Sequence, residues 1–216
     1  MQNQNQAKEL YTEKASLYDR FFIGFLGWGK QLKTFFQKTN HLHSNMKVLD
    51  AGCGTGVITQ TLYELAQEKG YEGLEFHAFD LSASMLGIFR QWIKKEEIAN
   101  VELAEADVLK TGSLPPTWKE YDLIVTSTML EYLPKPEVKN ALVNLKKLLK
   151  NDGTVLVFIT KRNLITRWLA GAWWKANLYT KSEIQSVLEE AEFGQIEFKK
   201  FVRWWSSSIL VIEAKK

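Results

Sequence analysis

The chain has few of the residues that form disulfides or bind metals. One cysteine and three histidines occur among its 216 residues. A single cysteine excludes an internal disulfide, and three histidines leave few side chains for a metal centre. His41 and His43 lie two residues apart, but the sequence around them has no cluster of further ligands, so we interpret them as loop residues. No metal site is predicted.

Long apolar runs are also lacking. The longest apolar stretches, such as FFIGFLGW at 21–28, fall well short of the roughly 20 residues that cross a bilayer. The first ten residues, MQNQNQAKEL, are polar and do not resemble a signal peptide. Because disulfides are also excluded, a cytoplasmic location is expected.

A strong charge of one sign is absent as well. The chain has 28 basic and 25 acidic residues, and the net charge of +3 indicates by itself neither nucleic acid nor an anionic membrane as a partner. Hydrophobic residues make up 45% and charged residues 25%, which excludes a disordered polymer. The length favours one α/β domain first and two very small domains second.

The hydrophobic pattern alternates short strands with helices. Strands are expected at 46–50, 74–80, 101–106, 121–126 and 154–160, and helices at 57–69, 82–95 and 136–150. This alternation predicts right-handed βαβ crossovers and a mainly parallel sheet. After a helix at 181–191, two strands at 195–203 and 206–214 have a connection too short for a crossover. We therefore expect an α/β fold whose seven-stranded, mainly parallel sheet ends in an antiparallel hairpin.

The N-terminal segment does not follow the repeating pattern. Apolar residues recur with helical spacing from Lys8 to about Thr39, and Gly24, Gly27 and Gly29 suggest a break or bend. We expect a polar tail and a helical cap over 1–45. One domain follows over 46–216, with a lid-like insert at about 161–179.

A glycine-rich loop follows the first predicted strand. Residues 48–56 read VLDAGCGTG, with glycines at Gly52, Gly54 and Gly56. Glycines there allow a ligand to approach the backbone and the helix N-terminus, at the sheet edge where α/β proteins bind ligands. The third glycine comes one residue earlier than in the dinucleotide motif G-x-G-x-x-G. Asp50 would repel a phosphate but can hold an ammonium group, so the loop favours a positively charged ligand.

Two further acids end the second and third predicted strands. Asp80 lies where a carboxylate accepts hydrogen bonds from both ribose hydroxyls, and Asp107 can approach the edge of an adenine. Either acid alone would more often be a helix N-cap. Together with Asp50, however, they end three successive strands, which argues against coincidence.

Five segments carry a resemblance to a known family. VLDAGCGTG is similar to the first motif of the class I S-adenosylmethionine-dependent methyltransferases, FDLSASML (79–86) to their ribose-binding segment and EADVLK (105–110) to their adenine-contacting segment. YDLIVTSTMLEYL (121–133) and LLKNDGTVLVFIT (148–160) resemble the family's segments around the fourth and fifth strands. The resemblance covers about 46–160 and points to the small-molecule branch that includes ubiquinone- and menaquinone-pathway enzymes.

The resemblance implies a Rossmann-like fold, with S-adenosylmethionine as methyl donor and S-adenosylhomocysteine as product. The implied reaction is in-line methyl transfer to a small, apolar or aromatic molecule, which needs orientation and exclusion of water but no metal. The residues that it implies for the cofactor site are Asp50, Gly52, Gly54, Gly56, Asp80, Leu81, Asp107, Val108 and Thr126.

The acceptor side has fewer candidates. A general base is needed only if the acceptor is a weak acid such as an alcohol or phenol. Glu131, after the fourth strand, is a candidate base or a group that holds an amine; the alternative is a solvated acid at a helix entry. Tyr18 can bring a phenol from the N-terminal cap, and the alternative for it is core packing.

Two other functions stay open at this point. The first is an NAD-dependent oxidoreductase, against which the early third glycine argues. The second is a non-catalytic module that binds an adenosyl ligand. Nucleic acid is not an expected partner, because residues 126–129 read TSTM where base-modifying methyltransferases carry Asn/Asp-Pro-Pro-aromatic.

The insert at 161–179 combines apolar residues with cations and contains no acid. It fits a substrate lid, a peripheral membrane contact, or a packing or dimer surface. Five of the eight tryptophans lie here or near the hairpin corner: Trp168, Trp173, Trp174, Trp204 and Trp205. We expect these two regions to determine the methyl acceptor, whose identity the sequence leaves open together with the oligomeric state.

Overall fold

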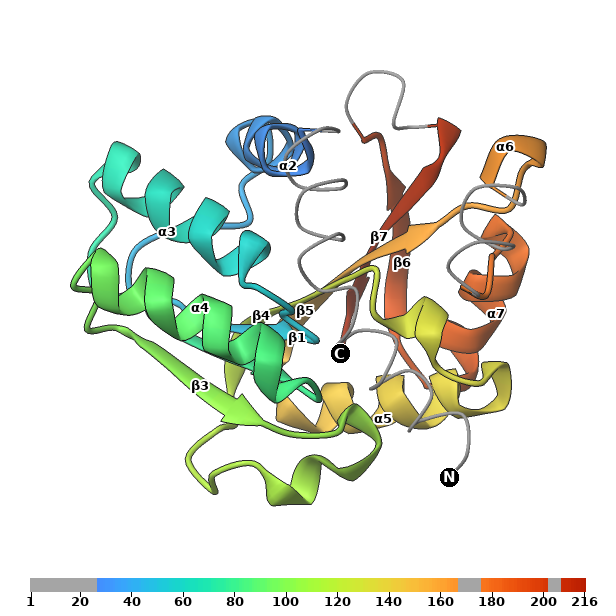
Figure 1. Cartoon of the computed structure of the whole chain (residues 1–216). Coiled ribbons are helices and arrows are strands. Elements are labelled where there is room, and N and C mark those ends of the chain that lie inside the picture. Colours follow the sequence, from blue (N-terminus) through green and yellow to red (C-terminus); the bar gives the residue numbers. More distant parts are fainter. Residues whose placement is uncertain (1–26, 167–175, 202–206) are drawn as a thin grey trace. The chain divides into compact units, whose positions relative to one another are not determined.

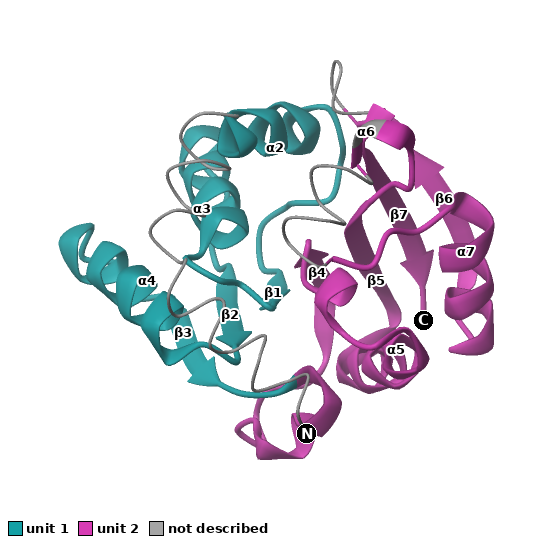
Figure 2. Ribbon diagram, turned by 45° about the vertical axis from the view of Figure 1, so that its right-hand side comes forward, with its two compact units in different colours: residues 1–107 teal, residues 108–216 magenta. Residues whose placement is uncertain are grey.

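The computed structural model describes residues 27–166, 176–201 and 207–216 (Figure 1). The chain divides into two compact units, residues 1–107 and 108–216, which Figure 2 shows in different colours. Tyr18 and the five tryptophans named above lie outside the described residues. Within the described ranges, no helix is both long and apolar enough to cross a membrane.

Seven strands form one sheet in the order β3-β2-β1-β4-β5-β7-β6. The pairs β1–β2, β2–β3 and β4–β5 are parallel, whereas β5–β7 and β6–β7 are antiparallel. The predicted α/β fold, with a mainly parallel sheet and an antiparallel C-terminal hairpin, is confirmed.

The described part of the first unit, residues 27–107, contains three strands and three helices. Its strands are β1 (Lys47–Ala51), β2 (Glu75–Asp80) and β3 (Val101–Glu105), and its helices are α2 (Trp28–Gln37), α3 (Val57–Lys69) and α4 (Ala83–Lys95). Val48 and Leu49 of β1 and Phe76 of β2 are buried, as is typical of parallel strands covered on both faces. Helix α2 is the described part of the predicted N-terminal cap; Gly27, with a φ of 62°, directly precedes it.

The described residues of the second unit contain the other four strands. They are β4 (Tyr121–Ser127), β5 (Leu149–Thr160), β6 (Gly194–Lys199) and β7 (Ile209–Lys215). Its helices are α5 (Val138–Leu148), α6 (Leu164–Thr166) and α7 (Lys181–Glu190), with 3₁₀ turns η2 (Val108–Ser113), η3 (Leu130–Tyr132) and η4 (Lys135–Glu137). Thr180 caps α7 in a capping box with Glu183.

Strand β5 is longer than the sequence pattern predicts. Tyr121 pairs with Leu149 and Leu123 with Thr154, so residues 150–153 form an irregularity inside the strand. Asn151-Asp152-Gly153, which separate the predicted helix 136–150 from the predicted strand 154–160, therefore form a bulge in β5. A Cβ atom at Gly153 would lie 2.7 Å from the Tyr121 carbonyl oxygen, which explains why glycine occupies this position.

Replacing Gly153 with alanine is expected to destabilise the chain by about 1–3 kcal/mol, because the backbone of β4 blocks the added methyl group. Gly87→Ala is the control: a Cβ atom at this position in α4 meets nothing within 4 Å, and alanine favours a helix interior by about 0.5–1 kcal/mol. Chemical denaturation of both variants measures the difference. Equal stability of the two would contradict the bulge geometry.

Candidate functional site

The glycine-rich loop folds back onto the end of β2. Gly52, Gly54 and Gly56 all have positive φ, at 74°, 55° and 90°, a region that other residues rarely adopt. The N–H groups of Gly52 and Cys53 both donate to the Phe79 carbonyl oxygen, at 2.9 and 3.0 Å. The loop between β1 and α3 is therefore held in one conformation by the neighbouring strand.

Gly56 also permits a close approach of α4 to the start of α3. It occupies the N-cap position of α3, and a Cβ atom there would lie 2.5 Å from the Phe89 ring. Phe89 itself is fully buried. The third glycine of the motif thus serves helix packing as well as backbone conformation.

The Asp80 carboxylate ties the loop to the second βα connection. Its Oδ2 accepts a hydrogen bond from the Gly54 N–H, and its Oδ1 accepts one from the Ser82 N–H, each at 2.8 Å. Burial raises the pKa of Asp80, and these N–H donors oppose the increase. Ser82, not Asp80, caps α4 by accepting from the Met85 N–H. The Leu81 N–H lowers the pKa of Asp80 as well. A carboxylate has about four acceptor sites, so Asp80 can still accept from a ligand hydroxyl.

Asp50 has one carboxylate oxygen that the described residues leave without a hydrogen bond. Its Oδ2 accepts from the N–H and the hydroxyl of Thr59, at 3.2 and 2.8 Å. Its Oδ1 is buried and has no partner among the described residues. Burial raises the pKa of Asp50 to about 7, although the Thr59 bonds lower it. An unpaired buried acceptor is costly, so a ligand N–H at this oxygen would be stabilising.

Cys53 lies inside the loop but has no sign of reactivity. Burial raises the pKa of its thiol well above the usual value, and the carboxylates of Asp50 and Asp80 raise it further. The thiol is thus protonated at neutral pH and behaves as a small hydrophobic side chain.

The remaining predicted cofactor residues are divided between the two units. In the first unit, Leu81 directly follows β2 and Asp107 lies two residues after β3, both half-buried. In the second unit, Val108 begins η2, and its carbonyl oxygen accepts from Asn144 Nδ2 at 3.1 Å. Thr126 in β4 is buried, and its hydroxyl has no hydrogen-bond partner among the described residues.

Glu131 of η3 is buried in the second unit. Its Oε2 accepts from the Thr160 N–H at 2.8 Å and its Oε1 from the Thr160 hydroxyl at 2.9 Å. Only 2% of the residue is exposed, so the alternative of a solvated acid at a helix entry is wrong. Burial raises the pKa of Glu131 to about 7, although both Thr160 bonds lower it.

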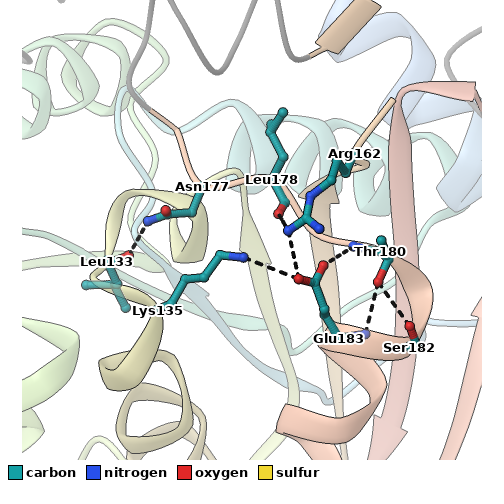
Figure 3. Close-up of polar contacts among 8 residues, drawn as sticks. All are labelled: Leu133, Lys135, Arg162, Asn177, Leu178, Thr180, Ser182 and Glu183. Carbon is teal, nitrogen blue, oxygen red and sulfur yellow. Dashed lines mark hydrogen bonds and ion pairs between the residues drawn. The ribbon is translucent and has the colours of Figure 1, made fainter. Parts of the chain in front are cut away.

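A second polar cluster surrounds Glu183 of α7 (Figure 3). Its carboxylate forms ion pairs with Arg162 at 2.7 Å and Lys135 at 3.4 Å. It also accepts a hydrogen bond from the Thr180 N–H at 2.7 Å. Burial alone would raise its pKa, but the bonds from Thr180 and Arg162 lower it to about 2. Arg162 also donates to the Leu178 carbonyl oxygen. The charge of Arg162, one of the cations of the predicted insert, is therefore paired within the unit.

Three residues with structural roles in the second unit are not among the predicted site residues. Thr160 and Asn177 both bond Glu131, Asn177 by donating its N–H to the Glu131 carbonyl oxygen, and Glu183 pairs with Arg162. These contacts join groups distant in the sequence, so no local pattern marks the first two. For Glu183 a signal was present, since Thr180 and Glu183 have the spacing of a capping box before a helix. No group of three or more His, Cys, Asp or Glu residues suited to a metal ion occurs in the described ranges.

Solved structures show which class of protein has this fold. The chain is similar to a putative O-methyltransferase from Nostoc punctiforme, with a TM-score of 0.72 and 18% identity, over 94% of this chain and 60% of that one. It is also similar to magnesium protoporphyrin IX methyltransferase from Synechocystis with bound SAH, with a TM-score of 0.62 and 19% identity, over 87% of this chain and 83% of that one. The fold is that of class I S-adenosylmethionine-dependent methyltransferases.

Sequence comparison then assigns the family. The profile of the methyltransferase domain family matches residues 42–201, and the chain belongs to this family. It is 29% identical over 168 residues to the ubiquinone biosynthesis O-methyltransferase of Glaesserella parasuis, covering 77% of this chain and 62% of that protein. It is 31% identical over 114 residues to the malonyl-[acyl-carrier protein] O-methyltransferase of Paenibacillus sp., covering 53% of this chain and 38% of that protein.

The chain therefore spans between about two fifths and three fifths of the length of these curated relatives. The resemblance to class I methyltransferases, inferred from VLDAGCGTG and the four segments after it, is confirmed. The alternative of an NAD-dependent oxidoreductase is not compatible with this family membership.

Gly56→Ala is expected to destabilise the chain more than Gly70→Ala, by about 1–3 kcal/mol, because only at Gly56 does the added methyl group meet the buried Phe89 ring. Gly70 is a matched control. It ends the same helix with a φ of 66°, and a Cβ atom there meets nothing within 4 Å. Denaturant unfolding measures both; an equal loss would show that backbone conformation alone requires Gly56.

Asp50 should make stability depend on pH. Its pKa of about 7 in the folded chain exceeds the ordinary value of 3.8, so the folded state keeps a proton that the unfolded state releases. The free energy of unfolding is therefore expected to fall as pH rises from about 4 to about 7. Asp50→Asn should reduce this slope, as measured by denaturant unfolding at several pH values. An unchanged slope would contradict a buried, protonatable Asp50.

Proposed function

We propose that the chain transfers a methyl group from S-adenosylmethionine to a small, apolar or aromatic acceptor. The observation that carries this proposal is the buried Oδ1 of Asp50, which has no partner among the described residues and lies beside a glycine-rich loop of fixed conformation. A carboxylate oxygen in that position suits the ammonium group of the methionine part of the cofactor. It would repel the pyrophosphate of a dinucleotide.

The other loop residues have complementary roles in this proposal. Gly52, Gly54 and Gly56 border the methionine part, because their positive φ values bring the loop backbone close to the ligand. Asp80, already oriented by two backbone N–H groups, accepts from the ribose hydroxyls.

The adenine side is assigned to residues at other strand ends. We assign Asp107 and Val108 to the adenine, and include Leu81 and Thr126 in the cofactor site. The paired N–H donors on Asp80 support a preorganised site, because its carboxylate does not have to reorient when a ligand arrives.

When bound, S-adenosylmethionine supplies an electrophilic methyl group on a sulfonium. The contribution of the protein is to orient donor and acceptor and to exclude water, which can lower the barrier by about 7 kcal/mol or more. Relatives named ubiquinone biosynthesis O-methyltransferase and magnesium-protoporphyrin O-methyltransferase support a small-molecule acceptor. We assign Glu131, which lies in η3 after β4, to the acceptor side of the site.

Calorimetry with S-adenosylhomocysteine tests the cofactor assignment. Asp80→Ala removes the acceptor for the ribose hydroxyls and is expected to weaken binding by about tenfold to a hundredfold. Asp152→Ala is the matched control, since it removes an exposed aspartate from the β5 bulge and should bind as the wild type does.

Thermal unfolding of each variant, with and without ligand, shows that the proteins compared are folded. Folded Asp80→Ala with wild-type affinity would refute the ribose assignment. A wild-type chain that binds no S-adenosylhomocysteine would refute the proposed function.

A further inference from the structure

Strand β4 leaves the sheet before its neighbour β5 ends. The last registered pair is Ser127 with Phe158, and the Thr128 N–H donates to the Phe158 carbonyl oxygen at 2.9 Å. Thr128 has a φ of 52°, and the chain turns there into η3. Strand β5 continues to Thr160, whose N–H and C=O groups need new partners because β4 no longer provides them.

The Glu131 side chain replaces the missing strand at one of these groups. In a continued parallel ladder, the next N–H of β5 on this side would donate to a carbonyl oxygen of β4. Here the Thr160 N–H donates instead to Glu131 Oε2 at 2.8 Å, and the Thr160 hydroxyl donates to Oε1 at 2.9 Å. A carboxylate thus stands in for a backbone carbonyl.

The segment 177–179 replaces the strand at the other group. The Tyr179 N–H donates to the Thr160 carbonyl oxygen at 3.2 Å, and the Arg162 N–H donates to the Tyr179 carbonyl oxygen at 2.8 Å. Lys161 and Tyr179 form a parallel bridge. The segment therefore takes the position beside β5 that β4 has vacated.

The same segment is bound to the backbone around Glu131. The Asn177 N–H donates to the Glu131 carbonyl oxygen at 2.7 Å, and Asn177 Nδ2 donates to the Leu133 carbonyl oxygen at 2.8 Å (Figure 3). Glu131 therefore contacts β5 through its side chain and segment 177–179 through its main chain. Three pieces of chain meet at this one residue.

This geometry disfavours a proton-accepting role. Both carboxylate oxygens already accept a bond from Thr160, and the residue is 2% exposed. A general base needs an oxygen directed at the proton it removes. The bonds of Glu131 instead fix the course of the backbone.

We propose that Glu131 is a positioning residue that substitutes for β4 in the sheet and holds the turn 128–133 and the segment 177–179 at the carboxyl end of β5. This proposal rests on the proposed function in one respect, namely that the methyl acceptor binds near the carboxyl end of β5. The contacts themselves are independent of any ligand.

The groups around Glu131 can accommodate both the protonated and the ionised form of its carboxyl group. Thr160 faces it from β5, and its hydroxyl can either donate to Oε1 or accept from a protonated carboxyl group. Tyr179 faces Glu131 from the segment 177–179. Burial raises the pKa of Tyr179 to about 12, the Glu131 and Glu183 carboxylates add to this increase, and Arg162 opposes it. Lys135 lies 5.1 Å over the Tyr179 ring. The Thr160 contacts can thus persist in both protonation states of Glu131.

Two variants separate positioning from size alone. Glu131→Gln can still accept from the Thr160 N–H through its oxygen and donate to the Thr160 hydroxyl through its amide nitrogen. Glu131→Leu fills similar space but offers no acceptor. Thr160→Val is a third variant, which removes only the bond to Oε1.

Amide hydrogen exchange of the full chain is the main measurement. In Glu131→Leu, exchange at Thr160, Asn177 and Tyr179 is expected to be at least about tenfold faster than in the wild type, because their shared support is removed. Glu131→Gln should stay within about threefold of the wild type, and Thr160→Val should lie between the two. Exchange in α3 of the first unit is the internal reference for global unfolding. Unchanged exchange in Glu131→Leu, or equally fast exchange in Glu131→Gln, would overturn the proposal.

A pH titration gives a signature that packing alone would not produce. The Thr160 amide chemical shift is expected to titrate near pH 7 in the wild type and to show no such transition in Glu131→Gln. A transition that remains in Glu131→Gln would overturn the assignment of the Thr160 partner.

Calorimetry with S-adenosylhomocysteine on the same samples keeps the two proposals distinguishable. If the variants do not show the expected differences in exchange but the wild type binds the ligand, the positioning role is refuted and the proposed function stands. If the variants show the expected differences in exchange but the wild type binds no ligand, the proposed function is refuted and Glu131 remains the residue that holds these segments.

Discussion

The first unit depends on the hydrogen bonds that the Asp80 carboxylate accepts from the backbone of Gly54 and Ser82. They join the loop after β1 to the turn after β2, so that two consecutive βα connections form one structure. Burial makes a charged carboxylate costly, and the two N–H groups offset part of that cost. The glycine loop is thus already ordered by the protein, which suits a site that has to position a reactive group within a fraction of an ångström.

Buried carboxylates recur where strands end in this fold. Asp50 terminates the apolar run of β1 and bonds Thr59 of α3, while Glu131 bonds Thr160 at the end of β5. In both cases burial raises the pKa to about 7. Their surroundings differ, however: the Asp50 carboxylate keeps an oxygen without a partner among the described residues, and the Glu131 carboxylate uses both. That difference is why we assign ligand binding to the first and backbone positioning to the second.

Much of the fold and of the cofactor loop was predictable from local patterns. Helix α3 has the predicted bounds 57–69, and the strands of the parallel sheet lie within a few residues of prediction except β5. Strand β5 was predicted too short because Asn151-Asp152-Gly153 has the composition of a turn. Those residues bulge instead, since Leu149 pairs with Tyr121 before them. Strand pairing is a long-range interaction that turn propensity does not contain.

By itself, the sequence determined the class of the protein: the order of strands and helices, the glycine loop, and the acids at the carboxyl ends of β1 and β2. These features are encoded locally, because backbone conformation and strand ends depend on neighbouring residues. Only the tertiary structure decided the role of Glu131 and the pairing of Arg162. Their partners Thr160 and Glu183 lie 29 and 21 residues away along the chain, and the burial that perturbs the pKa of Glu131 exists only once these segments pack together.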